Sequence, residues 1–282
     1  MSTLRLTHAL AEQVRRFSRA LGRARRGDPT GVHQGRVASR RIREMLPLVA
    51  AADETRARRT RRDVRRVAAA LGAVRELDVT LGLLADRATR HAWHPVVVTR
   101  VHQQLEGARL ERQKDVVDAL RRVGTPALLR DLRRSAAGAA RGGVAACHQA
   151  LAERRRERAG ALADALQALG TLYVPDRLHE VRLCAKKLRY SLETERAVRL
   201  AAVARDIKTL SGMQEELGAL HDVQMLQDWL RRLGRDIGGD RATQAQLRRM
   251  GVELEGECRA MHAQVVADAP AWLKLARRLE QR

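Results

Sequence analysis

Apolar residues recur every three or four positions along most of the chain, which is the period of an amphipathic α-helix. Glycine and proline interrupt this pattern at 27–30 and 124–126, so we expect one helix to end and another to begin at each interruption. Leu, Ala and Arg dominate the segments, and β-branched or aromatic runs are rare. The pattern predicts an all-α fold with helices over about 4–26, 28–51, 53–91, 95–123, 127–169 (loosened near 142–143), two more within 176–233, and one from 241 to the C-terminus.

Several residues at these interruptions are suited to begin or bend a helix. Asp28 can accept a hydrogen bond as the cap of the second helix, and Pro29 suits the first helical turn. Asp176 is expected to cap a later helix in the same way. Pro47 is expected to bend the second helix shortly before its end near Ala51.

The chain contains an internal repeat. VHQGRVASRRIR begins at Val32 and LHEVRLCAKKLR begins at Leu178, which is 146 residues later. LGAVRELDV at Leu71 and LGALHDVQM at Leu217 are also separated by 146 residues. Simple Ala and Arg bias would produce matches at many spacings, so two matches at one spacing predict a duplication.

Each copy of the first repeated segment places basic residues on one helical face. In the first copy, the basic residues fall within a stripe about 80° wide and about 15 Å long, and Ala38, Ile42, Met45 and Val49 lie opposite. Leu188 and Leu192 lie opposite the stripe of the second copy. The stripes consist of His33, Arg36, Arg40 and Arg43 in the first copy and His179, Arg182, Lys186 and Arg189 in the second, flanked by Arg41 and Lys187.

A charged helix face is most often simply hydrated, but this arrangement is repeated. Like charges three and four positions apart repel one another on a helix. Because both copies keep a histidine and aligned basic residues despite this repulsion, we predict that a bound anion compensates the positive charge of the two faces. Guanidinium groups fork onto phosphate oxygens, and ammonium groups act as movable point charges, so a file of both suits a linear phosphate chain.

The overall charge agrees with an anionic partner but does not identify it. The 282 residues carry a formal net charge of +22, which attracts nucleic acid, polyphosphate or an anionic membrane surface. Because only five of the 55 basic residues are lysine, much of this charge reflects a general preference for arginine. The chain has three Trp, two Tyr and one Phe, and only Tyr190 adjoins a stripe. Proteins that bind single-stranded nucleic acid stack its bases on aromatic side chains, so these faces favour phosphate contacts without base recognition.

The histidines and cysteines do not form a recognisable metal pattern. His33 and His179 occupy matching places, where they could meet to bind a metal, contact phosphate or donate a neutral hydrogen bond, but nearby arginines would repel a cation. His91 and His94 are interpreted as a helix-end cluster without a carboxylate partner. The three cysteines form no CxxC pair, which argues against zinc or a disulfide framework. We expect no metal and no cofactor.

The chain also lacks the pattern of a secretory leader and any stretch of about 18 apolar residues that could span a membrane. We therefore expect a cytoplasmic protein without membrane association. The sequence leaves its oligomeric state open.

Taken in order, the repeated motifs resemble the CHAD family, the conserved histidine α-helical domain. The pattern H-x-x-R-x-x-x-[RK]-[RK]-x-R occurs at 33–43 and 179–189, and LG-x-x-[RH]-[DE] occurs at 71–76 and 217–222. The resemblance extends from about Leu4 to beyond Trp229. Gly35 departs from it, because a larger apolar residue is usual there.

The resemblance implies two pseudo-symmetric four-helix bundles, residues 1–124 and 125–282, which together form one domain that binds inorganic polyphosphate, with some relatives on polyphosphate granules. It assigns the binding role to the ten basic-stripe and flanking residues given above. Arg62, Lys208, Arg75 and His221 occupy matching places in the two copies and are weaker candidates.

Nothing in the sequence predicts catalysis. The ELEGE segment, Glu253 to Glu257, lacks the lysine and the strand context of the E-x-E-x-K pattern of triphosphatase domains fused to some relatives. The sequence contains no P-loop and no nucleophile elbow. We therefore expect a non-catalytic polyphosphate-binding protein. The alternatives are a protein that binds only the nucleic-acid backbone and a basic scaffold that docks an acidic protein.

Overall fold

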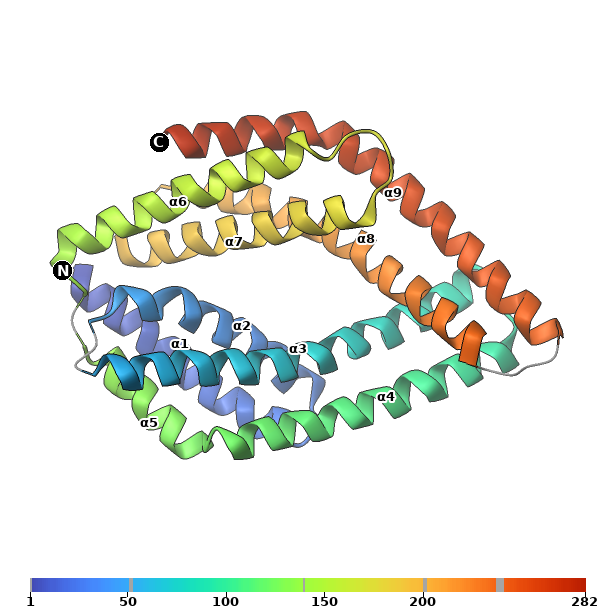
Figure 1. Ribbon diagram of the computed structural model, residues 1–282, viewed down its shortest axis with the longest axis horizontal. Coiled ribbons are helices and arrows are strands. Elements are labelled where there is room, and N and C mark those ends of the chain that lie inside the picture. Colours follow the sequence, from blue (N-terminus) through green and yellow to red (C-terminus); the bar gives the residue numbers. More distant parts are fainter. Residues whose placement is uncertain (1, 51–52, 139, 200–201, 237–240) are drawn as a thin grey trace.

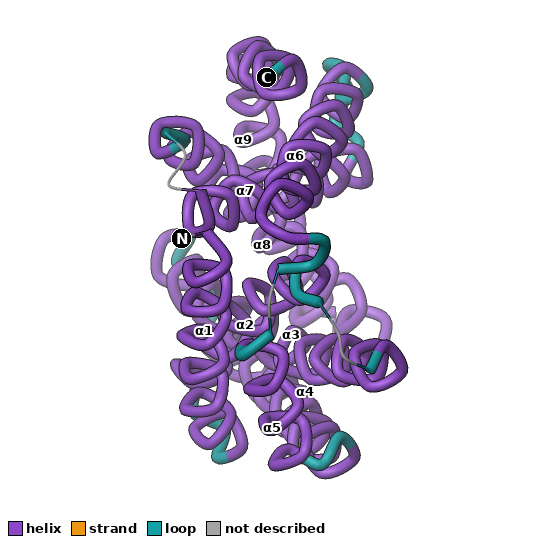
Figure 2. Tube along the Cα trace, turned by 90° about the vertical axis from the view of Figure 1, so that its left-hand side faces the viewer, coloured by secondary structure: helices purple, strands orange, loops and turns teal. Residues whose placement is uncertain are grey.

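The protein is all-α in the part of the chain that the computed structural model describes, residues 2–50, 53–138, 140–199, 202–236 and 241–282 (Figure 1). The predicted fold class is confirmed. Figure 2 shows the same residues as helices joined by short loops. The helices are α1 (Ser2–Arg25), α2 (Pro29–Met45), α3 (Glu54–Arg90), α4 (Pro95–Arg122), α5 (Thr125–Ala136), α6 (Gly143–Gln167), α7 (Pro175–Arg199), α8 (Ala204–Asp236) and α9 (Arg241–Gln281). None of these helices is long and apolar enough to cross a membrane.

The predicted helix ends hold within a few residues except at three places. The region predicted to be helical over 127–169 is divided into α5, which ends at Ala136, and α6, which begins at Gly143. The Asp28 carboxylate caps α2 as predicted, because it accepts a hydrogen bond from the Thr30 N–H at 2.9 Å. However, α2 ends at Met45, because the segment containing Pro47 forms a 3₁₀ turn, Leu46–Leu48; the predicted end at residue 51 lies outside the described residues. Asp176 does not precede α7 but lies in its first turn, where its charge faces the positive helix end.

Most helices that follow one another in the chain pack against one another, as α1 to α4 and α6 to α9 do. The buried apolar side chains form three cores. Phe17, Ile42 and Leu71 belong to a core formed by α1, α2, α3, the end of α4 and α5, to which the start of α6 and the end of α7 also contribute. Leu188 and Leu217 belong to a second core formed by α6, α7, α8 and the end of α9. The buried position of Ile42, Leu188 and Leu192 confirms the apolar faces predicted for the two basic helices.

Helix α5 begins the second half according to the predicted boundary, yet it packs on α1 and α3. Its Leu128 and Leu132 side chains are buried in the first core. A shift of 146 residues carries α4 and α5 together onto α9. The break between α4 and α5 at Gly124, where φ is +61°, then corresponds to Pro270 inside α9. The same stretch is thus broken in the first half and continuous in the second.

A third core joins the two halves where the α3–α4 turn meets α8 and α9, at the right of Figure 1. Leu84 and Val101 from the first half pack with Leu226 and Leu254 from the second. The halves are therefore not separate bundles, because this core draws side chains from both.

Charged side chains surround this third core, and we call Arg87, His91, Trp93, Glu253 and Glu257 the tip joint. Glu257 accepts hydrogen bonds from Arg87 Nε at 2.7 Å and pairs with His91 Nε2 at 2.6 Å. Trp93 Nε1 donates to Glu253 at 2.5 Å, and the Trp93 ring stacks on His91 with 5.6 Å between ring centroids. His91 thus has a carboxylate partner after all, supplied by α9.

Candidate anion-binding site

The two basic helices present their charged faces because their opposite faces are buried. Val32 and Ala38 on α2 and Val181 on α7 are fully or almost fully buried. Gly35 allows the close approach of α2 to α3, since a Cβ added there would lie 3.0 Å from Leu71 Cδ1. This contact explains why the larger residue usual in the family would be crowded here.

Helix α2 packs on α7, and this brings the two predicted stripes together. Arg36 and Arg40 on α2 both lower the pKa of Lys186 on α7, which requires them to lie near it. Burial and Arg36 likewise lower the pKa of Arg182 on α7. We call Arg36, Arg40, Arg182 and Lys186 the basic cluster.

The basic cluster is half-buried, so its charges are poorly hydrated. Burial is the largest cause of the lowered pKa of all four side chains, and the neighbouring cations add to it. Together they lower the pKa of Lys186 to about 7 and that of Arg40 to about 10. Gathering like charges away from water costs free energy that a bound anion would offset.

Two acidic residues face the basic cluster without neutralising it. Glu76 on α3 and Asp222 on α8 both favour the charged forms of Arg36 and Arg182. These acids are 146 residues apart, at the last position of the LG-x-x-[RH]-[DE] elements. Within the described residues, neither lies within ion-pair distance of the cluster, and burial raises the pKa of Asp222 despite the surrounding arginines.

An aromatic ring lies at one end of the basic cluster. The Arg40 guanidinium sits 4.5 Å from the centroid of the buried Tyr190 ring, and that of Arg189 sits 5.0 Å from it. Glu193, which the sequence reasoning missed, holds Arg41 at 3.3 Å and Arg189 at 3.5 Å. Cation–π contacts and Glu193 thus fix the flanking arginines while the cluster itself keeps its charge.

His33 and His179, which the sequence suggested could meet, each lie beside the long helix that follows their own helix. His179 contacts His221, with 5.3 Å between ring centroids. Arg75, which is the counterpart of His221 at the 146-residue spacing, lowers the pKa of His33 together with burial, Arg36 and Arg40. Burial and nearby Arg182 lower the pKa of His221 to about 4, so this ring is neutral at neutral pH. The structure thus brings the weaker candidates Arg75 and His221 to the edge of the cluster.

The remaining predicted residues lie farther out. Arg43, Lys187, Arg62 and Lys208 are exposed, and within the described chain no ion pair or ring contact ties them to the cluster. Periodicity placed Arg43 within the first stripe and Lys187 beside the second, but it could not show which side chains turn toward the partner helix.

Two guanidinium groups at the site retain unused donors. The Nε atoms of Arg182 and Arg189 are buried, and neither has a hydrogen-bond partner among the described residues. Buried donors are almost always satisfied in proteins, so these atoms indicate a place for an acceptor from outside the chain. Among the described residues no group of three or more His, Cys, Asp or Glu side chains is arranged to hold a metal ion.

Fold and site together define an all-helical protein with two facing basic helices and a half-buried cluster of unpaired cations between them. The family model of the CHAD domain matches residues 8–231, so the chain belongs to the CHAD domain family. A search among curated protein sequences finds no match.

Two solved structures share the fold of this chain. One is the CHAD domain from the plant Ricinus communis, with a TM-score of 0.67, 20% identity, and coverage of 97% of this chain and 90% of that one. The other is PptA from Streptomyces chartreusis, also with a TM-score of 0.67 and 20% identity, covering 99% of this chain and 98% of that one.

Proposed function

We propose that this protein binds inorganic polyphosphate without hydrolysing it, and that the basic cluster is the centre of the binding site. The observation that carries the proposal is the convergence of Arg36, Arg40, Arg182 and Lys186 from two helices, half-buried and without ion-pair partners among the described residues. A linear chain of phosphates offers closely spaced negative charges to such a cluster and needs no base recognition.

The same features argue for binding rather than catalysis. Phosphoryl hydrolysis commonly uses metal ions held by carboxylates to neutralise the developing charge. Here the two nearby acids face arginines, and the described residues hold no metal-binding group. Retention of polyphosphate, including association with polyphosphate granules, is the role that this arrangement suits.

A competition assay tests the proposal. Labelled long-chain polyphosphate is titrated with the wild-type protein and with a variant that carries Arg36→Ala, Arg40→Ala, Arg182→Ala and Lys186→Ala. We expect the variant to lose affinity by about a hundredfold, and its plot of log affinity against log salt to be less steep by about 3, because four phosphate contacts are removed. Release of inorganic phosphate should stay at background.

A matched variant separates the site from overall charge. Arg112, Arg121, Arg122 and Arg259 are exposed, and changing all four to Ala removes the same charge elsewhere. This control should retain wild-type affinity within about threefold. Equal loss in both variants would make net charge, and not the cluster, the cause.

Two further outcomes would replace the proposal. Equal competition by single-stranded DNA would favour a protein that binds nucleic-acid backbones. Failure of both polymers to bind, together with co-purification of an acidic protein, would favour a docking scaffold.

A further inference from the structure

A second basic region adjoins the basic cluster. It is a groove of about 670 Å³ between α1 and α2, lined on the α2 side by His33 and Arg41. On the α1 side, Arg16, Arg19 and Arg23 line it at spacings of three and four residues. His33 lines the groove and lies close enough to Arg36 and Arg40 for their charges to help lower its pKa, so the groove and the basic cluster meet at His33.

The groove has no basic counterpart in the second half. The buried residues Val14, Phe17 and Leu21 of α1 match Ala159, Leu162 and Leu166 of α6, so these two helices correspond at a shift of 145 residues. That shift places three exposed residues opposite the groove arginines: Ala161, Asp164 and Ala168. The duplication thus supplies two members of the basic cluster from each half, whereas the three groove arginines of α1 have no basic counterparts at this shift on α6.

The groove arginines are not all neutralised. Arg16 pairs with Glu12 at 2.7 Å, and Arg23 pairs with Asp28. Arg19 makes no ion pair with any described residue. It also lines a second cleft, of about 720 Å³, between α1 and α5.

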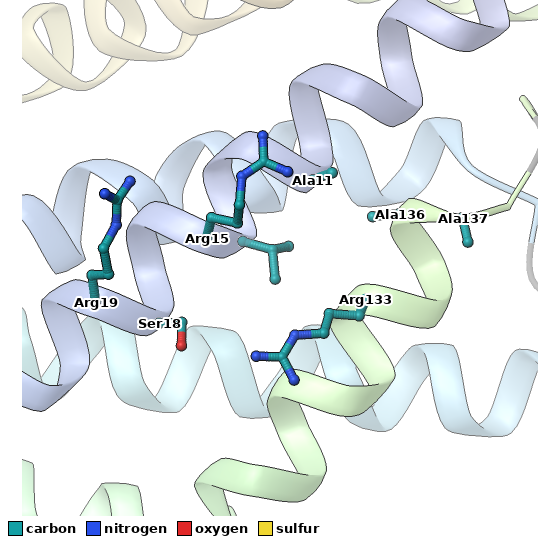
Figure 3. Close-up of a pocket in the computed structure, with 8 residues that line it drawn as sticks. Ala11, Arg15, Ser18, Arg19, Arg133, Ala136 and Ala137 are labelled. Carbon is teal, nitrogen blue, oxygen red and sulfur yellow. The ribbon is translucent and has the colours of Figure 1, made fainter.

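Figure 3 shows this second cleft, with Arg15 and Arg19 on α1 and Arg133 on α5 across from them. Ala11, Val14 and Ala136 form its apolar lining. Since Arg19 borders both hollows, a basic surface continues from the α1–α2 groove over α1 to α5.

We propose that this surface is an extension of the polyphosphate path that exists only on the first half. A long chain bound at the basic cluster leaves it past His33 and Arg41, follows Arg16 and Arg23 along α1, and crosses toward α5 at Arg19. This inference rests on the proposed function and adds that the affinity of the protein for polyphosphate increases with the length of the polyphosphate chain.

The test compares long-chain polyphosphate with tripolyphosphate, which is too short to occupy the cluster and the groove together. In the variant Arg16→Ala/Arg19→Ala/Arg23→Ala, we expect the affinity for the long chain to fall about tenfold. Its plot of log affinity against log salt should become less steep by about 2, since each phosphate contact contributes about 0.7. Affinity for tripolyphosphate should change by less than about twofold, because the basic cluster is intact.

Two further variants sharpen the comparison. Arg112→Ala/Arg121→Ala/Arg122→Ala removes three exposed charges from α4 and should leave both affinities near those of the wild type. Ala161→Arg/Asp164→Arg places two cations on α6 at exposed positions and should raise the affinity for the long chain alone. Circular dichroism melts establish that each variant is folded.

The outcomes separate the two proposals. If the α1 variant behaves like the α4 control, or loses both affinities equally, the extension is wrong while polyphosphate binding at the cluster stands. If the wild-type protein binds neither polyphosphate nor tripolyphosphate, the proposed function fails and the extension fails with it.

Discussion

The basic cluster and the tip joint both connect the two halves of the protein, and they treat charge in opposite ways. At the tip joint, the Arg87 and Glu257 side chains are only 12% and 19% exposed and lie 2.7 Å apart. His91 and Trp93 complete the joint with hydrogen bonds to Glu257 and Glu253. At the basic cluster, four cations lie together without a carboxylate at ion-pair distance among the described residues.

This difference separates a structural use of charge from a binding use. Satisfied charges at the tip joint fix the geometry of the third core and leave nothing for a ligand to add. Unsatisfied charges at the cluster reduce the stability of the protein without ligand. A bound anion would remove this repulsion, so the lost stability would be recovered as binding free energy. Net charge alone could not have distinguished the two regions, because it counts paired and unpaired charges alike.

The largest effect on stability should come from breaking the tip joint. Glu253→Gln with Glu257→Gln leaves the half-buried His91 without its anionic partners and removes Glu257 from Arg87, which keeps its exposed neighbour Asp86. We expect the free energy of unfolding to fall by about 2 kcal/mol in urea denaturation. Polyphosphate affinity should remain near that of the wild type, because the cluster lies elsewhere.

A control for this prediction is Glu111→Gln with Glu255→Gln, which removes the same charge from exposed positions. Its stability should stay within about 0.5 kcal/mol of the wild type. A tip-joint variant as stable as this control would show that the joint is not structural.

Removing one cation from the basic cluster should raise the free energy of unfolding, whereas breaking the tip joint lowers it. In Lys186→Met the aliphatic stem is retained and the repelled charge is lost. We expect the unfolding free energy without ligand to rise by about 1 kcal/mol, while polyphosphate affinity falls severalfold. Thermal melts with and without polyphosphate measure both effects, and Lys114→Met, at a 70% exposed lysine, is the control. A destabilised Lys186→Met variant would contradict the view that the cluster is strained.

The last prediction concerns the pH dependence of stability. The pKa of Lys186 is lowered from 10.5 to about 7 by burial and by Arg182, Arg40 and Arg36. Between these two values the unfolded chain holds more protons than the folded one, so stability should rise as pH increases from 7 to 9. The increase should be smaller in Lys186→Met. Equal pH profiles of the two proteins in urea denaturation would mean that Lys186 is not repelled in the folded state.

Local patterns in the sequence account for the helices and their buried faces. Ile42, Leu188 and Leu192 are buried where a 3.6-residue period places them, because which face of a helix is apolar depends on its own residues. The end of α2 was harder to predict, since Pro47 permits either a bent helix or a 3₁₀ turn.

Long-range contacts were beyond the reach of such patterns. The basic stripes could be identified from the sequence, but whether they face each other depends on how α2 packs on α7. HAWH at 91–94 and ELEGE at 253–257 were each interpreted alone, one as a helix-end cluster and the other as a segment without catalytic features. The fold joins them as the tip joint, with His91 bound to a carboxylate 166 residues away.

The third core also has a consequence for synthesis of the chain. Its apolar side chains on α3 and α4, including Leu84 and Val101, pack against α8 and α9, which leave the ribosome last. Until then the newly made first half exposes an apolar patch, and such patches promote aggregation of nascent chains. Expressed alone, residues 1–136 should therefore aggregate or recruit chaperones, and their core around Phe17 and Ile42 also lacks Cys147, Leu151 and Val198, which later parts of the chain supply.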